Sequence, residues 1–114
     1  MFNLKGYNFE EHNKEARRVW ESFNKGEPSR VPMCIGTNAR YFLFNSEANP
    51  QGISFREYTE DPEIMFNAQV QFDHWKRTHI LADHPMGLPT EDEGWLISVD
   101  FQNFYEAVWF GCPL

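Results

Sequence analysis

The stretch NKGEPSRVP, residues 24–32, decides the fold, because it ends one predicted element and begins another. Gly26 stands where a helix commonly ends in a left-handed residue, and Pro28 prevents the helix from continuing. Residues 31–36 are almost continuously apolar, which is typical of a strand buried on both faces, with Pro32 confined to its beginning. The stretch therefore predicts a junction between a helix and a strand.

The residues before this junction predict a helix over 9–25. Side chains recur at spacings of three and four on one narrow face, and charged residues occupy the other face. Asn8 stands in the N-cap position. The narrow face is formed by Phe9, His12, Ala16, Val19, Trp20 and Phe23.

Start signals of two further helices follow a long loop over 37–52. Ser54 and Glu57 have the spacing of a capping box, so a short helix is expected there. The run Asp61-Pro62-Glu63 combines a cap, a proline at the first helical position and an acidic first turn, and it predicts a helix over 62–80.

The last third repeats the junction pattern, with a predicted strand near 95–100 and a helix near 103–110. Two such junctions around a long helix favour the α/β class, as the beginning of a (β/α)8 TIM barrel or of a layered α/β domain. A complete barrel takes about 250 residues, and this chain has 114. We therefore expect a single partial domain over 1–114, with the barrel incomplete.

Composition limits the partners. The net charge of −7 and the lack of a basic patch argue against a nucleic-acid partner. No apolar run approaches the ~18 residues of a membrane span, so no membrane is expected and the default location is the cytoplasm. Cys34 and Cys112 are far apart in sequence, and free buried thiols in a reducing compartment are the simplest interpretation.

Two positions are candidates for a substrate site. Arg40, followed by Tyr41, comes just after the first predicted strand, where an arginine can hold a carboxylate or phosphate by two hydrogen bonds; the alternative is a surface arginine paired with a nearby acid. Asp100 ends the second predicted strand, where a carboxylate can act as an acid, a base or an orienting group. It could equally cap the following helix.

Other chemistry finds little support. His79, Asp83 and His84 are potential metal ligands, but their spacing matches no recognised zinc site, and His79 is better explained as a hydrogen-bonded core residue. Neither cysteine belongs to a nucleophile signature, and the glycines are isolated rather than gathered in a phosphate-binding loop.

The chain resembles the N-terminal third of uroporphyrinogen decarboxylase-like proteins, a family that includes the methylcobamide:coenzyme M methyltransferases. Four segments carry the resemblance and follow the family's order over nearly the whole chain. They are GEPSRVP at 26–32 after its helix, EYTEDPEIM at 57–65, GLP at 87–89 with Trp95, and VDFQNFYEA at 99–107 closing on FGC at 110–112.

The resemblance implies a barrel whose first strand lies near Val31 and whose second lies near Ile97. Decarboxylases of the family carry two arginines after the first strand; Arg40 matches the second and the first is missing, which disfavours porphyrinogen decarboxylation. Asp100 matches the aspartate that these enzymes place after the second strand. The methyl-transferring relatives use zinc and a corrinoid partner, and their zinc ligands would fall after residue 114, so no cofactor is expected in this chain itself.

The resemblance thus implies an N-terminal segment of a corrinoid-linked methyltransferase-type enzyme, inactive alone, which meets its small-molecule substrate in the full-length protein. Such a segment should form homo-oligomers, because uncovered strand edges and helices seek partners. The alternative is a self-contained small α/β binding or assembly module without catalysis.

Overall fold

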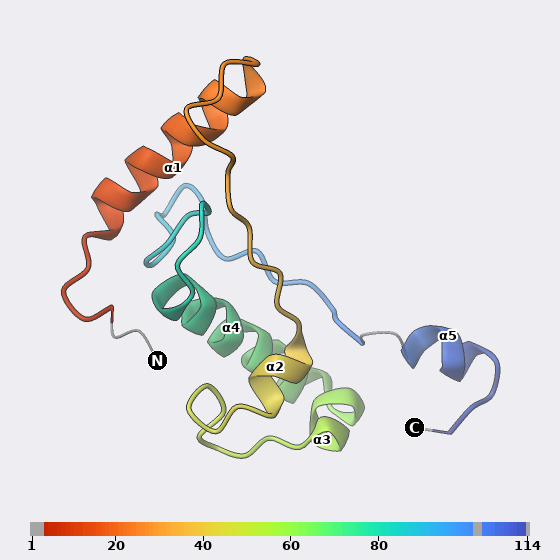
Figure 1. Ribbon diagram of the computed structural model, residues 1–114. Coiled ribbons are helices and arrows are strands. Elements are labelled where there is room, and N and C mark those ends of the chain that lie inside the picture. Colours follow the sequence, from red (N-terminus) through yellow and green to blue (C-terminus); the bar gives the residue numbers. More distant parts are fainter. Residues whose placement is uncertain (1–3, 102–103, 114) are drawn as a thin grey trace. The chain divides into compact units, whose positions relative to one another are not determined.

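The computed structural model describes residues 4–101 and 104–113, and these residues are helical or irregular, without any strand. The helices, in chain order, are α1 (Phe9–Asn24), α2 (Ala39–Leu43), α3 (Phe55–Glu60), α4 (Pro62–His79) and α5 (Phe104–Trp109) (Figure 1). The prediction of an α/β class and an incomplete TIM barrel is therefore wrong for the described residues.

The predicted strands near 31–36 and 95–100 are irregular segments instead. A strand needs a neighbouring strand for its backbone hydrogen bonds, and no ladder forms among the described residues. Burial on both faces is absent as well: Val31 is 75% exposed and Leu96 is 91% exposed. Short apolar runs predict burial only if other segments pack against them, and that condition is not met here.

The predicted helices are confirmed because their start signals are local. Asn8 accepts a hydrogen bond from the backbone N–H of Glu11 and caps α1. Ser54 and Glu57 form the expected capping box of α3. The Asp61 carboxylate accepts from the backbone N–H groups of Glu63 and Ile64 at the start of α4. The helix predicted near 103–110 is α5, and residue 103 lies outside the described residues.

The chain divides into two compact units, each built from two stretches of sequence. Unit 1 comprises Met1–Gly36 and Asp73–Trp95, and unit 2 comprises Thr37–Phe72 and Leu96–Leu114. Helix α4 contributes to both, because the boundary falls between Phe72 and Asp73 within it.

Unit 1 joins α1 to the irregular stretch that follows α4. Asn13 donates its amide to the carbonyl of Met86 and accepts from the Met86 N–H, so one side chain satisfies both backbone groups. Gly87 adopts φ +77°, and a Cβ there would lie 3.2 Å from Phe9. The turn therefore requires glycine for its backbone angle and for the close approach of α1. The buried side chains of this unit include Ala16, Val19, Trp75, Ala82 and Met86.

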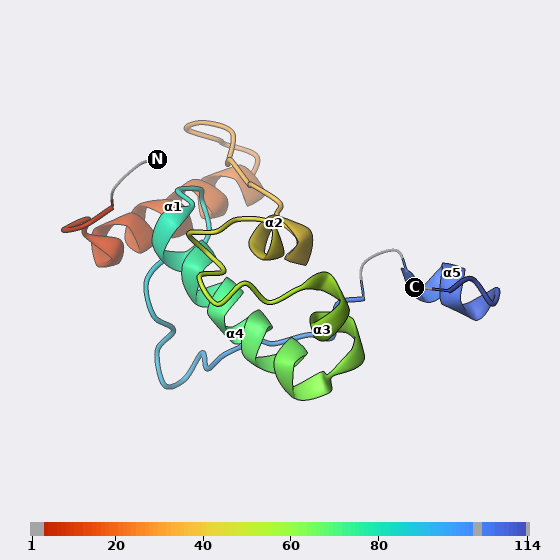
Figure 2. The same cartoon turned by 90° about the horizontal axis from the view of Figure 1, so that it is seen from below.

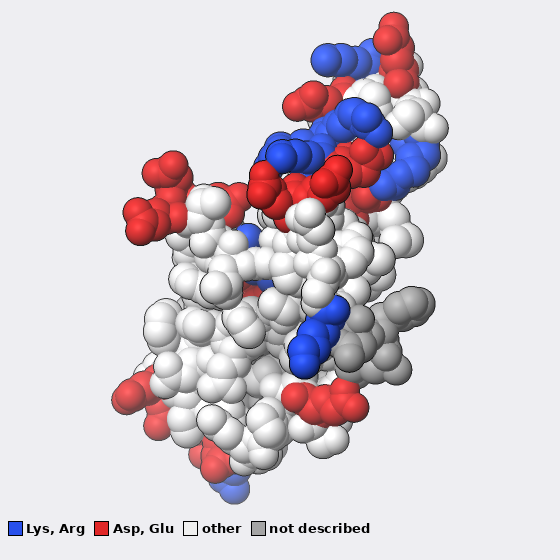
Figure 3. All heavy atoms as spheres, turned by 90° about the vertical axis from the view of Figure 1, so that its left-hand side faces the viewer, with Lys and Arg blue, Asp and Glu red and all other residues white. Residues whose placement is uncertain are grey.

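The solvent face of α1 carries interleaved acidic and basic side chains, as Figure 3 shows. Two of its ion pairs join Lys14 to Glu10 and Arg18 to Glu15. Among the described residues, every helix is too short or too polar to traverse a lipid bilayer.

Unit 2 packs α2 and α3 beside the first half of α4 (Figure 2). The rings of Phe42 and Phe72 lie 5.4 Å apart between α2 and α4. The loop between α2 and α3 is organised by the buried Asn49, whose amide donates to the carbonyls of Leu43 and Ile53 and whose oxygen accepts from the Ile53 N–H. The hydrogen bonds of one polar side chain therefore hold the backbone of this loop, which has no regular secondary structure.

Replacing Asn49 by alanine should lower the free energy of unfolding by about 2–3 kcal/mol, because three hydrogen bonds are lost and buried carbonyls are left without donors. Urea denaturation followed by circular dichroism measures the change. Asn67→Ala is the matched control, since Asn67 is exposed on α4, and its effect should stay within about 0.5 kcal/mol. Equal stabilities of the two variants would contradict the role given to Asn49.

Candidate functional site

A dense polar cluster in unit 1 surrounds Asp83. Its two carboxylate oxygens each accept a 2.6 Å hydrogen bond from Arg30, and one of them also accepts from the Met33 N–H at 2.7 Å. Its backbone N–H donates to the Met33 carbonyl at 2.8 Å, and its carbonyl accepts from the Trp20 indole at 2.6 Å. Every polar atom of this residue is therefore bonded, and three separate segments meet on it.

The electrostatics of this cluster stabilise the ionised carboxylate. Asp83 is 6% exposed, and the hydrogen bonds from Arg30 lower its pKa to about 2, against the opposing effect of burial, with a smaller contribution from the Met33 N–H. The same hydrogen bond raises the pKa of Arg30. A two-point bond between guanidinium and carboxylate is the strongest form of this pair.

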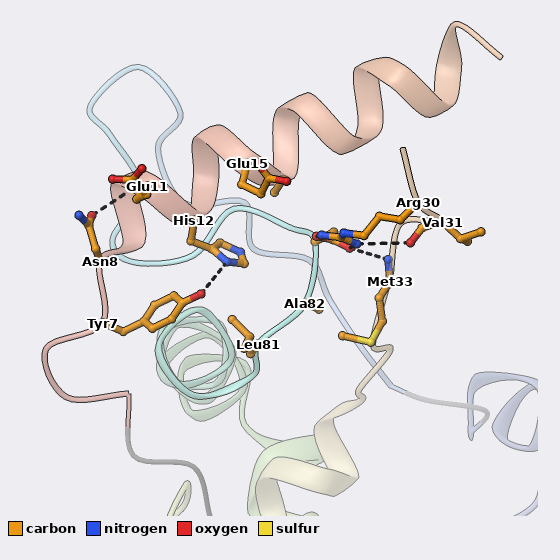
Figure 4. Close-up of a pocket in the computed structure, with 12 residues that line it drawn as sticks. Tyr7, Asn8, Glu11, His12, Glu15, Arg30, Val31, Met33, Leu81 and Ala82 are labelled. Carbon is orange, nitrogen blue, oxygen red and sulfur yellow. Dashed lines mark hydrogen bonds and ion pairs between the residues drawn. The ribbon is translucent and has the colours of Figure 1, made fainter. Parts of the chain in front are cut away.

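A cavity of about 660 Å³ lies beside the pair, between the start of α1 and residues 30–33 and 81–83 (Figure 4). Polar groups stand on its walls and apolar side chains cover much of the rest. Its lining consists of Tyr7, Asn8, Glu11, His12, Glu15, Ala16, Arg30, Val31, Met33, Leu81, Ala82 and Asp83.

His12 joins two parts of this cavity wall. Its Nδ1 lies 3.3 Å from the Tyr7 hydroxyl, and its Nε2 lies 3.3 Å from the carbonyl of His84. A neutral imidazole that donates through Nε2 and accepts from the phenol at Nδ1 satisfies both contacts. Burial lowers the pKa of His84, whose carbonyl is the partner of His12. The geometry thus connects His12 to the backbone and holds the segment before α1 in place.

The predicted substrate-binding residues, Arg40 and Tyr41, stand in the first turn of α2 in unit 2. Asn38 caps this helix by accepting from both of their backbone N–H groups, at 3.1 and 3.4 Å. Arg40 is half-buried and Tyr41 is 44% exposed. The cap fixes the backbone of both residues at the start of the helix.

Asp100, the predicted catalytic residue, is half-buried in the same unit. Its backbone carbonyl accepts a 2.8 Å hydrogen bond from the Tyr58 hydroxyl, which in turn accepts from the Gln69 amide. Tyr58 is only 1% exposed, and burial raises its pKa. The cap position of α5 falls on residue 103, outside the described residues, so the capping alternative for Asp100 is not tested.

A second cavity, of about 540 Å³, lies within unit 2 and is mostly apolar. Val99 and Phe101, the chain neighbours of Asp100, both contribute to its wall. The complete lining is Thr59, Glu60, Pro62, Met65, Phe66, Gln69, Ile97, Ser98, Val99 and Phe101.

The structure also gives the positions of the less favoured candidates, His79 and the two cysteines. His79 is exposed rather than in the core, and its ring stacks on Trp75 at 4.9 Å. Cys34 and Cys112 are free, as expected, but both are exposed, so the prediction of buried thiols is wrong. Within the described part of the chain, no group of three or more His, Cys, Asp or Glu residues is arranged to hold a metal.

Sequence reasoning missed the cluster around Asp83 because its members are far apart in the chain. Arg30 and Asp83 are separated by 53 positions, and no local spacing rule joins them. The one local signal is Asp83 itself, and its sequence neighbours indicate only a potential metal ligand.

Comparisons of the chain with known protein families, with characterised proteins and with solved structures found no match. The uroporphyrinogen decarboxylase-like resemblance therefore stays a prediction.

The lowered pKa of Asp83 predicts how stability depends on pH. Because the folded-state pKa is about 2 and the ordinary value is 3.8, the carboxylate stabilises the fold above about pH 4, and this contribution is lost as pH falls from 4 toward 2. After allowance for solvent screening at the half-exposed Arg30, it amounts to about 1 kcal/mol. Urea denaturation at a series of pH values measures it.

Asp83→Asn should remove this contribution and flatten the acid limb of the stability profile, with an additional loss at pH 7 from the broken Arg30 pair. Asp92→Asn is the matched control, since Asp92 is exposed in an acidic loop. An acid limb of unchanged steepness in Asp83→Asn would refute the assignment.

Proposed function

We propose that this chain is an N-terminal segment of a uroporphyrinogen decarboxylase-like protein of the corrinoid-linked methyltransferase type, and that it is inactive alone. In this proposal Arg40 binds an anionic group of a small substrate, Tyr41 lines the same site, and Asp100 orients the reacting group. The proposal includes no barrel, because the described residues form no strand.

The observation that carries the proposal is the anchoring of Asp100. The bond from the buried Tyr58 hydroxyl to its carbonyl anchors the backbone at Asp100. Both chain neighbours of Asp100 line the 540 Å³ cavity, a volume in the range of small-molecule sites. Asp100 itself is not among the lining residues, so the support for its role is the anchored backbone: a carboxylate on an anchored segment is suited to orienting a bound group.

The capped start of α2 supports a role for Arg40. The Asn38 cap fixes its backbone, and a planar guanidinium can hold a carboxylate or sulfonate by two hydrogen bonds. In the proposed longer protein the zinc ligands follow residue 114 and a corrinoid partner supplies the methyl group, so neither is assigned to residues of this chain. The proposal places the protein in the cytoplasm.

Binding to the chain itself tests the proposal. An amide NMR titration of the labelled chain with 2-mercaptoethanesulfonate, an anionic thiol, should move resonances of residues 38–43 and 97–101. Arg40→Gln should weaken this binding about tenfold or more, because a charge-assisted hydrogen bond is worth roughly 1.5–3 kcal/mol. Arg56→Gln is the matched control, since Arg56 is exposed on α3 and paired with Glu60, and it should leave the affinity unchanged.

Shifts confined to other residues, or equal affinities for the two arginine variants, would rule out the site. In the longer protein, Arg40→Ala and Asp100→Ala should each lower turnover, and wild-type rates in both would remove the assignment.

A second function, a helical binding or assembly module without catalysis, is favoured by a different observation. Large apolar side chains are exposed on the irregular segments, among them Val31, Met33, Leu96 and Val99. Val31 and Met33 belong to unit 1, and Leu96 and Val99 belong to unit 2. Large exposed apolar side chains on one segment can mark an interaction site. A chain that shows no anion binding but associates reversibly would support this second function.

A further inference from the structure

The segment 31–36 in unit 1 is extended and unpaired. It follows the turn after α1 and runs without bends or turns (Figure 1). Every second side chain is a large exposed hydrophobe: Val31 is 75% exposed, Met33 is 52% exposed and Ile35 is 47% exposed. This period of two is the pattern of one face of a β-strand.

One edge of this segment is already occupied. The N–H and the carbonyl of Met33 both bond Asp83, and the carbonyl of Val31 accepts from Arg30. In an extended chain the backbone groups of successive residues point to opposite edges. The edge that carries the backbone groups of the odd-numbered residues is therefore hydrogen-bonded within unit 1.

The other edge carries the carbonyl of Pro32, both backbone groups of Cys34 and the N–H of Gly36. No hydrogen bond links these four groups to the part of the chain that the structure describes. An unpaired edge of this kind is a template for another strand.

We propose that this edge pairs with the same edge of a second copy of the chain, as an antiparallel two-stranded ribbon centred on Cys34. The two Cys34 residues exchange two backbone hydrogen bonds. The Pro32 carbonyl of each copy accepts from the Gly36 N–H of the other, which adds two more. The pairing is independent of the methyltransferase-type function proposed above.

A second copy is favoured over another occupant because the edge is complementary to itself. The donors and acceptors around Cys34 are related by a two-fold axis, so each group meets its opposite. Pro32 lacks an N–H, and in this register that missing donor costs only one bond per copy. The partner of the exposed Met33 is Ile35 of the second copy, so apolar side chains also face one another.

Charge does not oppose the pairing. Natural edges are commonly protected by charged residues, above all lysine, and residues 31–38 contain none. Arg30 would lie opposite Asn38 in this register, so like charges are not brought together. The proposed contact is a single short ribbon, and interfaces below ~1,200 Å² are typically weak, so the dimer should be weak and concentration-dependent.

Cross-linking through Cys34 tests the register. The α-carbons of a hydrogen-bonded antiparallel pair lie about 5.5 Å apart, within the range that a disulfide spans. In a Cys112→Ser background, oxidation with copper phenanthroline should convert most of the chain to a covalent dimer at concentrations where association occurs. The matched control is Cys34→Ser with Cys112 retained, and it should give little dimer. Equal yields in the two backgrounds would overturn the proposal.

A second measurement does not depend on cysteine chemistry. Sedimentation equilibrium of the reduced chain should show a mass that rises from one chain toward two with concentration. Ile35→Lys places a charge on the ribbon and should hold the chain monomeric, whereas Leu88→Lys, at a 67% exposed position of unit 1 outside the ribbon, should leave the association unchanged. Circular dichroism checks that both variants retain their helices.

A wild-type chain that stays monomeric at all concentrations, or an association abolished equally by both lysine variants, would exclude this ribbon. Association that persists in Ile35→Lys would likewise assign the contact to another surface.

Discussion

The two-point bond between Arg30 and Asp83 is the contact on which unit 1 depends. Asp83 also accepts from the Trp20 indole of α1 and from the Met33 N–H, and its own N–H donates to the Met33 carbonyl. In a sheet, hydrogen bonds between neighbouring strands would hold the extended segment. Here the hydrogen bonds to one buried aspartate hold it. Asp83 is buried and Arg30 is half-exposed, so loss of Arg30 would leave a buried carboxylate without its charged partner. The extended segment and the end of α1 are held by this single residue.

Unit 2 uses the same strategy with neutral groups. The Asn49 side chain bonds backbone groups on both sides of a loop. The Tyr58 hydroxyl accepts from the Gln69 amide and donates to the carbonyl of Asp100. Buried polar groups must find partners, and in a chain with so much irregular backbone the partners are side chains. The positions of the loops therefore depend on individual side chains. A substitution at one of these residues can change one loop without changing the others, and this property suits a binding site.

The sequence was a good guide where the signals were local. Asn8, the Ser54–Glu57 box and the Asp61–Pro62 start all predicted helices within one or two residues of their observed bounds. It failed where structure depends on distant partners. The apolar runs at 31–36 and 95–100 predicted strands, but a ladder needs a neighbour that no local pattern can reveal. The pairing of Arg30 with Asp83 was missed for the same reason, whereas the roles of Arg40 and Asp100 stay predictions.

The division of each unit into two stretches of sequence has a consequence for synthesis on the ribosome. Unit 1 cannot be completed by residues 1–36 alone, because its second stretch begins at Asp73. Arg30 is made 53 residues before Asp83, an interval of roughly 3–10 s at ordinary translation rates. During that interval the apolar face of α1 has been synthesised and the second stretch of unit 1 is still incomplete. The nascent chain is then open to chaperones, and substitutions that slow translation between these residues would lengthen that exposure without altering the finished fold.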